Sequence, residues 1–600
     1  PRSARLNHAS ALPGSALPPV SAETLTSPTS PAASGFTGAW RALAGLRTRL
    51  AGLAARSSDG ALATAISVVF SVASATPLLL TPVPPFQDLP NHLAAMTIQS
   101  DPGHWPEFVA NGYLKTNAAL FAFLDVVGSR FGFIVAAKLF AALVLAANSF
   151  VFPRVLLAFG GDDTPAGRAD ARRRMLVGSL FLFPMIHNWF VSMGMLDYAL
   201  AVPLSLGFLV LAKAQAAQPR PLRGVLMAVL AVATWYAHVF ALLVAGLIVV
   251  LYVLHPAGEF RRASASPMRG IVARGLPLLL PLVPAALLAA YSVALHALEP
   301  RGEMTGNYDF NLFLPPWQIV YNFWAEWCYG YTWLSIASFA VVVAGLLGLR
   351  NANQKVAFFS PVALAVLGAM YIFMPYVATN WFHVDSRMIP FLWFALLVRV
   401  PTKLPRLAAP ALVFAAATYF VGLAVDYKRL EGDRQAFLAG IDSVPENATL
   451  LPLIFDPRGT SENTRNMLHQ WGYYVVAKKT AAPLLFAHSK SFPLTYREAP
   501  PARFNHLVLE DTMRVARSKA VFCKETHGLG GECEAHFEKF WADFWVDATA
   551  RYDTLLLWGA SEDVLRQLPP RYEPVLTRGK LMIFRRSPNT PSPKATARFP

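Results

Sequence analysis

Apolar runs separated by short polar connections fill the sequence from Ala61 to about residue 425. Hydrophobic residues make up 54% of the chain and charged residues only 15%, so much of it is expected to face lipid. A bilayer offers no water to backbone polar groups, and such runs therefore predict transmembrane helices. Eleven spans are expected, near residues 61–82, 132–158, 176–190, 196–214, 223–237, 239–254, 271–296, 332–349, 356–375, 387–400 and 408–425. Several are shorter than the roughly 20 residues of a straight span, which makes broken helices a candidate for one pair.

The basic residues provide a test of this count. They form clusters at Arg41 to Arg56 before the first span, at Arg168, Arg172, Arg173 and Arg174 after the second, at Arg220 and Arg223 after the fourth, at Arg261, Arg262, Arg269 and Arg274 after the sixth, at Arg350 and Lys355 after the eighth, and at Arg399, Lys403 and Arg406 after the tenth. With eleven spans all six clusters fall on one side, which the positive-inside rule assigns to the cytoplasm. The N-terminus is then inside, and the residues after Asp426 are outside. The short apolar stretch 117–127 is expected to be a helix that lies on or dips into the outer face, because a further span there would invert every later loop.

Three parts of the chain are expected. Residues 1–58 combine a disordered Ser- and Pro-rich tail with a basic amphipathic helix, GAWRALAGLRTRLAGLAAR, suited to an anionic membrane surface; an ordinary helical tail is the alternative. Residues 59–425 form the transmembrane module, with a first outer loop at 83–131. Residues 426–600 form an extracytoplasmic α/β domain, in which ATLLPLIF, AAPLLFA, NHLVLE, DTLLLWG and KLMIFRR are predicted as short buried strands.

Several function classes are disfavoured by missing motifs. The chain has no phosphate-cradling Gly-rich loop with its Lys, no G-x-S-x-G and no H-E-x-x-H, which argues against an ATP-driven pump, a serine hydrolase and a zincin. The formal charge is +16, but no nucleic-acid-binding module accompanies it. A membrane surface accounts for that charge more simply, and no nucleic-acid partner is expected.

Polar residues gather in the loops that the topology places outside. The first loop contains PPFQDLPNHL with Asp88 and His92, and the following boundaries bring the candidates His187, Asp197, His238, His383, Asp385 and Arg387. Ionisable groups at the rim of a helical bundle are costly to desolvate, so they tend to be paired or functional. Each of them alone also fits a solvated loop residue or a histidine bonded to a carbonyl. Lys138, near the outer edge of its span, either extends to the interface or holds an anionic lipid phosphate.

The sequence resembles the GT-C superfamily of membrane glycosyltransferases. QDLPNHLA is similar to the D-x-P-N-H-L-A stretch of bacterial GT-C-like proteins, and HVDSRMIPF is similar to their late outer loop, where an Arg precedes a further span. The resemblance covers residues 60–600 as architecture. It implies a sugar donor carried on a polyprenyl phosphate, an acceptor that is a glycan, lipid or protein of the envelope, and a location in the bacterial inner membrane. The first loop lacks the Asp-Asp or Asp-Glu pair of better-known members, so a requirement for a divalent metal such as Mg²⁺ or Mn²⁺ stays open.

The residue types fit this chemistry. In an inverting transfer, a carboxylate removes the proton of the acceptor hydroxyl, and Asp88 is the candidate. Negative charge builds on the departing phosphate, where His92, His383 and Arg387 are candidates to stabilise it. Two other functions remain open: a transporter or flippase of lipid-linked glycans, which predicts broken helices and an internal repeat, and a scaffold subunit without activity.

Two cysteines lie close together in VFCKETHGLGGECEAHF. Cys523 and Cys533 are ten residues apart with a Gly-rich turn between them, which favours a disulfide on the outer side. Together with His527 and His536 they also present four ligands at a spacing that a tetrahedral zinc site could use.

Overall fold

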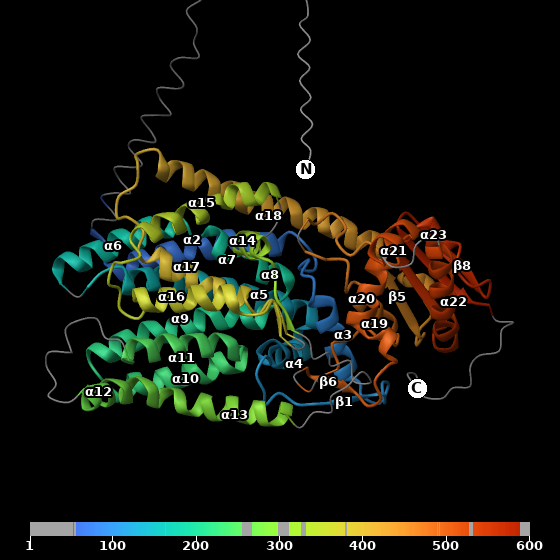
Figure 1. Ribbon diagram of the computed structural model, residues 1–600, viewed down its shortest axis with the longest axis horizontal. Coiled ribbons are helices and arrows are strands. Elements are labelled where there is room, and N and C mark those ends of the chain that lie inside the picture. The colour runs from blue at the N-terminus through green and yellow to red at the C-terminus, as the bar shows by residue number, and fades with distance from the viewer. Residues whose placement is uncertain are drawn as a thin grey trace, which may run out of the picture. The chain divides into compact units, whose positions relative to one another are not determined.

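The computed structural model describes residues 52, 56–162, 164–254, 267–297, 311–325, 332–378, 381–462, 464–488, 490, 492–526 and 532–587. The expected tail and most of the expected amphipathic helix lie outside these residues. Residues 59–600 form one compact unit, in which a helical bundle adjoins a smaller domain containing a sheet (Figure 1).

Every predicted span coincides with an apolar helix. Five helical segments are long and apolar enough to cross a membrane, Asp59–Leu79 (α2), Phe133–Phe159 (α5), Leu196–Ala217 (α9), Ile271–Ala294 (within α12, Pro267–Leu279, and α13, Val283–Ala297) and Ala408–Ser443 (containing α18, Ala408–Leu438). A sixth is a pair, Pro165–Ser179 (α6) and Phe183–Met193 (α7, Phe183–Ile186, and α8, Trp189–Met193), bent by 75°. The other five predicted spans coincide with shorter helices, α10 (Pro221–Ala237), α11 (Val239–Leu254), α15 (Thr332–Arg350), α16 (Pro361–Phe373) and α17 (Ile389–Leu397). The protein is a helical membrane protein, and the number of eleven crossings stays a prediction.

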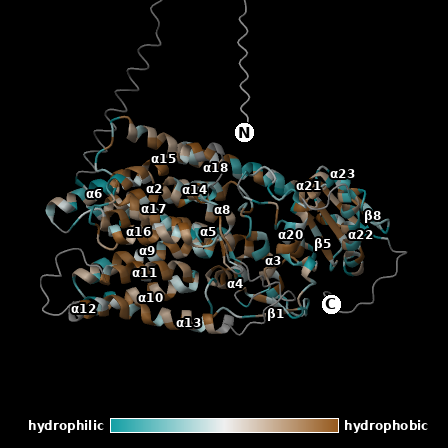
Figure 2. Ribbon diagram, viewed as in Figure 1, coloured by the Kyte–Doolittle hydropathy of each residue, from teal (hydrophilic) through white to brown (hydrophobic). Residues whose placement is uncertain are grey.

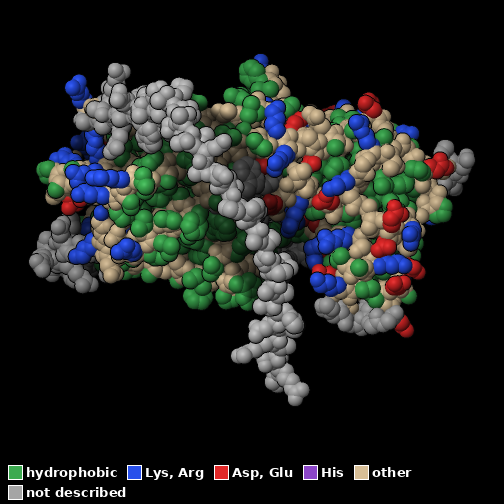
Figure 3. Space-filling model, turned by 90° about the horizontal axis from the view of Figure 1, so that it is seen from above, with side chains coloured by type: hydrophobic (Ala, Val, Ile, Leu, Met, Phe, Trp, Pro, Cys, Tyr) green, Lys and Arg blue, Asp and Glu red, His purple; other side chains and the backbone are tan. Residues whose placement is uncertain are grey.

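Apolar side chains cover the outside of the bundle. Val69 of α2, Ile336 of α15 and Phe414 of α18 are 66%, 72% and 74% exposed. Figure 2 shows that hydrophobic residues dominate the bundle helices, whereas the domain with the sheet is mixed. Figure 3 shows apolar side chains over the middle of the bundle and Lys and Arg at its far end. A surface of this extent is costly in water and suits lipid.

Basic residues from loops that follow different predicted spans lie at the same end of the bundle. Arg172 forms an ion pair of 2.6 Å with Asp59 at the start of α2, and Phe159 at the end of α5 packs on Phe359. The fully buried Arg399 guanidinium donates to the carbonyl oxygens of Ala352, Gln354, Phe359 and Ala395. Two of the six basic clusters, those with Arg172 and Arg399, therefore contact segments that the sequence assigns to the same side.

The first outer loop is more ordered than the sequence indicated. It contains α3 (Leu89–Ser100) and α4 (Ala119–Phe131), of which only the second was expected as a helix. Between them, β1 (Phe108–Ala110) pairs antiparallel with β6 (Leu494–Tyr496) of the C-terminal region. Figure 1 shows α3 and α4 between the bundle and the C-terminal sheet. A second small sheet, β2 (Asn311–Leu312), β3 (Val377–Ala378) and β4 (Trp381–Phe382), joins two later loops.

The C-terminal sheet has the strand order β5-β7-β9-β8. The strands are β5 (Leu450–Ile454), β7 (Thr554–Trp558), β9 (Leu581–Arg586) and β8 (Tyr572–Arg578); β5 and β7 are parallel and the other two pairs antiparallel. The helices of this region are α19 (Gly472–Lys478), α20 (His506–Val515), α21 (Lys519–Glu525), α22 (Cys533–Arg551) and α23 (Glu562–Leu565). The α18 helix continues past residue 426, so the expected domain boundary falls inside a helix.

Two of the five predicted strands were wrong. NHLVLE lies at the start of α20, because the Asn505 side chain accepts a hydrogen bond from the Leu507 N–H and begins a helix whose Leu509 and Met513 are buried four residues apart. AAPLLFA has no strand ladder. Its backbone groups at Leu484 and Phe486 bond to the Asn91 side chain at 3.0 and 3.4 Å instead.

The first outer loop and the C-terminal domain meet without a gap at α3 and α19. A Cβ added to Gly472 would lie 2.3 Å from the Pro90 carbonyl oxygen, closer than any real contact. Only glycine lets the two helices approach to this distance.

We expect Gly472→Ala to destabilise the protein by about 1–3 kcal/mol, because the junction must open to admit the methyl group. Gly432→Ala is the matched control. Gly432 lies inside α18 and is exposed, and a Cβ added there would meet nothing within 4 Å, so alanine should be neutral or stabilising by up to about 1 kcal/mol. Thermal unfolding in detergent measures both; equal midpoints for the two variants would contradict the close contact.

Candidate functional site

A cavity of about 1150 Å³ lies between the bundle ends and the C-terminal domain. Six of the residues singled out in the sequence line it: Asp88, His92, Asp197, His238, His383 and Arg387. The opposite wall comes from the C-terminal domain and includes Arg465, His469, His488, His506, Glu510 and Arg514. The cavity therefore brings together carboxyl groups, guanidinium groups and imidazoles from elements far apart in sequence.

Asp88 is positioned by its backbone. Its N–H donates to the Met193 carbonyl oxygen at 3.0 Å, and the adjacent Gly194 has a φ of +88° that brings it against Asp88, so a Cβ there would lie 3.1 Å from the Asp88 nitrogen. Asp88 precedes α3 as its N-cap, with Pro90 in the first turn, but its side chain makes no capping hydrogen bond. The carboxylate is thus left for the cavity.

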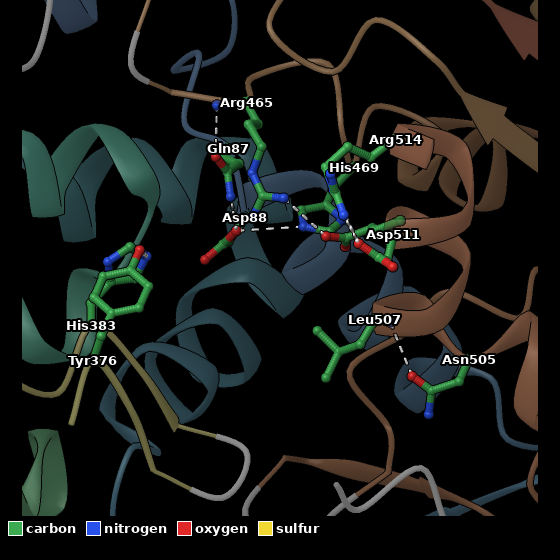
Figure 4. Close-up of polar contacts among 11 residues, drawn as sticks. Gln87, Asp88, Tyr376, His383, Arg465, His469, Asn505, Leu507, Asp511 and Arg514 are labelled. Carbon is green, nitrogen blue, oxygen red and sulfur yellow. Dashed lines mark hydrogen bonds and ion pairs between the residues drawn. The ribbon is translucent and has the colours of Figure 1, made fainter. Parts of the chain in front are cut away.

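The Asp88 carboxylate contacts two neighbours through one oxygen. Gln87 Nε2 donates to Oδ1 at 3.3 Å, and His469 Nε2 lies 3.6 Å from the same atom. Figure 4 shows Gln87, Arg465 and His469 close to Asp88, with His383 and Tyr376 across the cavity. Burial raises the pKa of Asp88 from 3.8 to about 7, although the Gln87 hydrogen bond and Arg465 oppose the rise. A carboxylate with a pKa near neutrality suits proton abstraction.

Three histidines that line the cavity, His92, His469 and His506, are neutral at pH 7. Burial lowers the pKa of His92 to about 4, and it lowers the pKa values of His469 and His506 well below the usual 6.5. His92 packs edge-on against the Phe121 ring, 5.0 Å between centroids, and its Nδ1 is buried without a hydrogen-bond partner among the described residues. His92, a candidate to stabilise the leaving phosphate, therefore carries no positive charge at pH 7, and the three imidazoles can act as hydrogen-bonding groups.

Arg387 supplies the buried positive charge. Its side chain is 6% exposed, and its Nε and Nη1 have no hydrogen-bond partner in the described part of the chain. The guanidinium lies 5.2 Å from the Trp381 ring centroid and 5.8 Å from that of Tyr198. Aromatic faces only partly replace lost hydration, so an unpaired guanidinium lining a cavity is a site for an anion.

Neighbouring residues hold this part of the cavity in shape. Asp197 Oδ1 accepts a hydrogen bond of 2.8 Å from the Leu120 N–H at the start of α4, and the Tyr198 hydroxyl donates to the Arg387 carbonyl oxygen. His238 Nδ1 accepts from the Phe240 N–H at 3.2 Å, which leaves the ring proton on Nε2 as a donor. His383 has a φ of +57°, an uncommon conformation for a residue other than glycine and one often found at functional sites.

Three of the proposed substrate-binding residues do not line the cavity. His187 is buried in the bundle, with its ring nitrogens 2.6 Å from the Tyr427 hydroxyl and 3.1 Å from the Ser74 carbonyl oxygen. Lys138 donates to the Thr81 carbonyl oxygen. Asp385 accepts from the Ser386 N–H at 2.7 Å and begins the short helix η4 (Ser386–Met388). These contacts give each of the three a structural function.

The C-terminal wall was not found from the sequence. The Arg465 N–H donates to Gln87 Oε1 at 2.8 Å, and its guanidinium pairs with Glu510 at 3.2 Å. His469 and His506 both pack against the Phe486 ring. The one available signal was the presence of five histidines in a domain expected on the outer side, and nothing in their spacing singled out the three that line the cavity or linked them to Asp88.

Metal ligands are not grouped in the described residues, where no set of three His, Cys, Asp or Glu could hold an ion. Cys523 and Cys533 form a disulfide, with their Cα atoms 5.6 Å apart, so their sulfur atoms are bonded to each other and not to zinc. The disulfide joins α21 to α22. Glu525 of α21 pairs with Arg514 of the cavity wall at 3.4 Å, which connects the disulfide to the site.

Comparison with known proteins gives a limited result. No family model matches the chain, and no curated protein matches it. The crystal structure of ArnT from Cupriavidus metallidurans bound to undecaprenyl phosphate has 12% identity and a TM-score of 0.46, covering 88% of this chain and 98% of that one. Its apo state has 11% identity and a TM-score of 0.44, covering 87% and 97%. At this level of similarity neither a family nor a residue role carries over to this chain.

The raised pKa of Asp88 predicts a pH-dependent stability effect. The folded protein holds the Asp88 proton up to about pH 7, whereas the unfolded chain releases it near 3.8. The carboxyl group's stabilising contribution is therefore present below pH 3.8 and lost as the pH rises through 7. At about 1.4 kcal/mol for each pH unit between the two pKa values, the loss is at most about 4 kcal/mol.

We expect Asp88→Asn to unfold at a higher temperature than the wild type at pH 8, and the difference to shrink as the pH falls toward 5. Thermal unfolding at several pH values measures this difference. A difference that stays constant over that range would mean that burial does not raise the pKa of Asp88.

Proposed function

We propose that the protein is a membrane glycosyltransferase that transfers a sugar from a polyprenyl-phosphate donor to an envelope acceptor. The observation that carries the proposal is that one cavity holds a carboxylate with a near-neutral pKa, Asp88, and a buried guanidinium without a partner among the described residues, Arg387. The first group suits removal of a proton, and the second suits the charge of a phosphate.

Asp88 acts as the general base in this proposal. The acceptor hydroxyl attacks the anomeric carbon of the donor sugar while the Asp88 carboxylate takes its proton. The new bond joins the acceptor oxygen to the anomeric carbon, and the bond from that carbon to the phosphate oxygen breaks. The electron pair leaves with the polyprenyl phosphate, and the proton stays on Asp88 until the product departs.

Arg387 binds the donor phosphate. Its Nε and Nη1 have no hydrogen-bond partner among the described residues, so the guanidinium can donate to phosphate oxygens. Because it is buried between Trp381 and Tyr198, its interaction with the phosphate is weakly screened and gains strength as charge develops on the leaving oxygen. His238 and His383, which also line the cavity, are neighbours that can donate to the phosphate or to the sugar hydroxyls.

The charge pattern supports a reaction on the outer face. The N-terminus is cytoplasmic and the domain after residue 426 extracytoplasmic, in the inner membrane of a bacterium. A donor with its tail in the bilayer then presents its head group at the level of the helix ends, where Asp88 and Arg387 lie. The acceptor, a glycan, lipid or protein, enters along the C-terminal wall.

A transporter of lipid-linked glycans is the second candidate function, because one predicted span is broken. The α6 and α7–α8 pair is bent by 75°, a feature of transporter folds. The break also has a local explanation, since the residues after it, Met193 and Gly194, hold the Asp88 backbone. A scaffold without activity remains the third candidate, and loss of transfer in a cavity variant would exclude it.

The enzyme hypothesis is tested with purified protein in liposomes that contain a mixture of polyprenyl-phosphate sugars and envelope extracts as acceptors. We expect transfer that falls at least about 10²-fold in Asp88→Asn, the size usual for loss of a general base. In Arg387→Met we expect a higher KM for the donor, together with a lower kcat, because the lost contact acts on both the bound donor and the leaving phosphate.

Arg350→Met is the matched control, since Arg350 is exposed at the end of α15 and does not line the cavity. It should retain wild-type rates. Labelled lipid-linked sugar could instead cross the bilayer without covalent transfer, in wild type and Asp88→Asn alike. That result would contradict the enzyme hypothesis and support the transporter hypothesis.

A further inference from the structure

The two contacts of the Asp88 carboxylate fall on the same oxygen. Gln87 Nε2 and His469 Nε2 both approach Oδ1, and within the described residues no hydrogen bond or ion pair reaches Oδ2. The carboxylate is thus held on one side and left open on the other. A base needs this arrangement, because the oxygen that takes the acceptor proton must be free of other donors.

The contacts of His469 indicate which ring nitrogen carries its proton. The side chain is 4% exposed, and Nδ1 is buried with no hydrogen-bond partner among the described residues. A buried N–H without an acceptor costs more than a bare nitrogen without a donor. The proton is therefore expected on Nε2, the nitrogen that faces Asp88, so that the imidazole donates toward Oδ1.

We infer that His469 of the C-terminal domain is a positioning residue for Asp88: its Nε2–H faces Oδ1 across 3.6 Å and leaves Oδ2 turned to the acceptor hydroxyl. The inference rests on the proposed function, in which Asp88 is the base, and it extends that function by giving the C-terminal domain a part in the reaction. His469 does not take the substrate proton itself. It keeps the carboxylate ionised and oriented before the acceptor arrives.

The same segment of the C-terminal domain also supports the other donor. The Arg465 N–H bonds to Gln87 Oε1 at 2.8 Å, which leaves the Gln87 amide nitrogen turned toward Asp88. Asn91, three residues after Asp88, is held by the backbone at Leu484 and Phe486. Displacement of residues 465–469 would therefore remove both donors from Asp88 at once.

Other charged groups near the pair are few and do not replace His469. Arg465 and Glu510 act on Asp88 with opposite signs and pair with each other. His92 lies on α3, and its electrostatic effect falls on His469. On the bundle side, Asp88 is packed against the uncharged backbone of Met193 and Gly194. A substitution of His469 should therefore change the pKa of Asp88 without a compensating change from another charged group.

The experiment compares His469→Phe, which keeps a ring of similar size but no donor, with His469→Gln, which keeps an N–H donor. The acid limb of the kcat profile against pH should move upward by up to about 0.5 pH unit in His469→Phe, as expected for the loss of a polar N–H that faces the carboxylate from beyond hydrogen-bond distance. The acid limb should move less in His469→Gln, and the KM for the donor should be unchanged in both variants. His536→Phe, an exposed histidine of α22 outside the cavity, is the control.

A second measurement does not require activity. The C=O stretch of the protonated Asp88 carboxyl, taken as the infrared difference between each protein and its Asp88→Asn form, is followed from pH 5 to 9. We expect the same upward movement in His469→Phe and its partial reversal in His469→Gln. If the wild type transfers no sugar but the infrared titration moves, the proposed function fails and the positioning of Asp88 stands. If transfer occurs and the titration is the same in all variants, or moves equally in Phe and Gln, the positioning inference is overturned.

Discussion

The arrangement of the whole site depends on the junction between the first outer loop and the C-terminal domain. Asn91 bonds to two backbone groups of a C-terminal segment that has no strand of its own, and Gly472 admits the Pro90 carbonyl group to a distance that no other residue allows. These contacts fix α3, and α3 fixes Asp88 at its N-terminal end. The residues from Asp88 to His92 therefore have two kinds of function. Asp88 and His92 line the cavity, and Pro90 and Asn91 contact the C-terminal domain.

The charges in the cavity are separated by their environment. Burial keeps His92, His469 and His506 neutral and brings the pKa of Asp88 near 7. The buried guanidinium that remains without a polar partner among the described residues is Arg387, on the bundle side. A reaction that removes a proton at one point and develops phosphate charge at another requires this separation, because a cationic histidine beside Asp88 would keep the carboxylate too weak a base.

Much of the fold followed from local patterns, whereas much of the site did not. Apolar runs and basic clusters predicted the helices and the shared end of the bundle, since both depend on residues near one another in sequence. Asp88 and Arg387 could be singled out because each follows or precedes an apolar run. Arg465 and His469 could not, because their function depends on contacts with Gln87 and Asp88 that only the folded chain creates. The strand predicted for NHLVLE was wrong, and Asp385 does not line the cavity, for a related reason: a single cap hydrogen bond, at Asn505 or at Asp385, decides the local structure.

The broken helix is better explained by the site than by transport. A straight continuation of α6 would carry Met193 and Gly194 away from the loop that they hold, and Gly194 adopts a left-handed conformation at the point where its backbone meets Asp88. Beyond the break, the Asn188 side chain accepts from the Val191 N–H and begins α8. The segment after the break therefore ends in a capped helix that is packed against the Asp88 backbone, which makes it a fixed support. Alternating access would require this contact to open in every cycle, and opening it would remove the backbone hydrogen bond that positions Asp88.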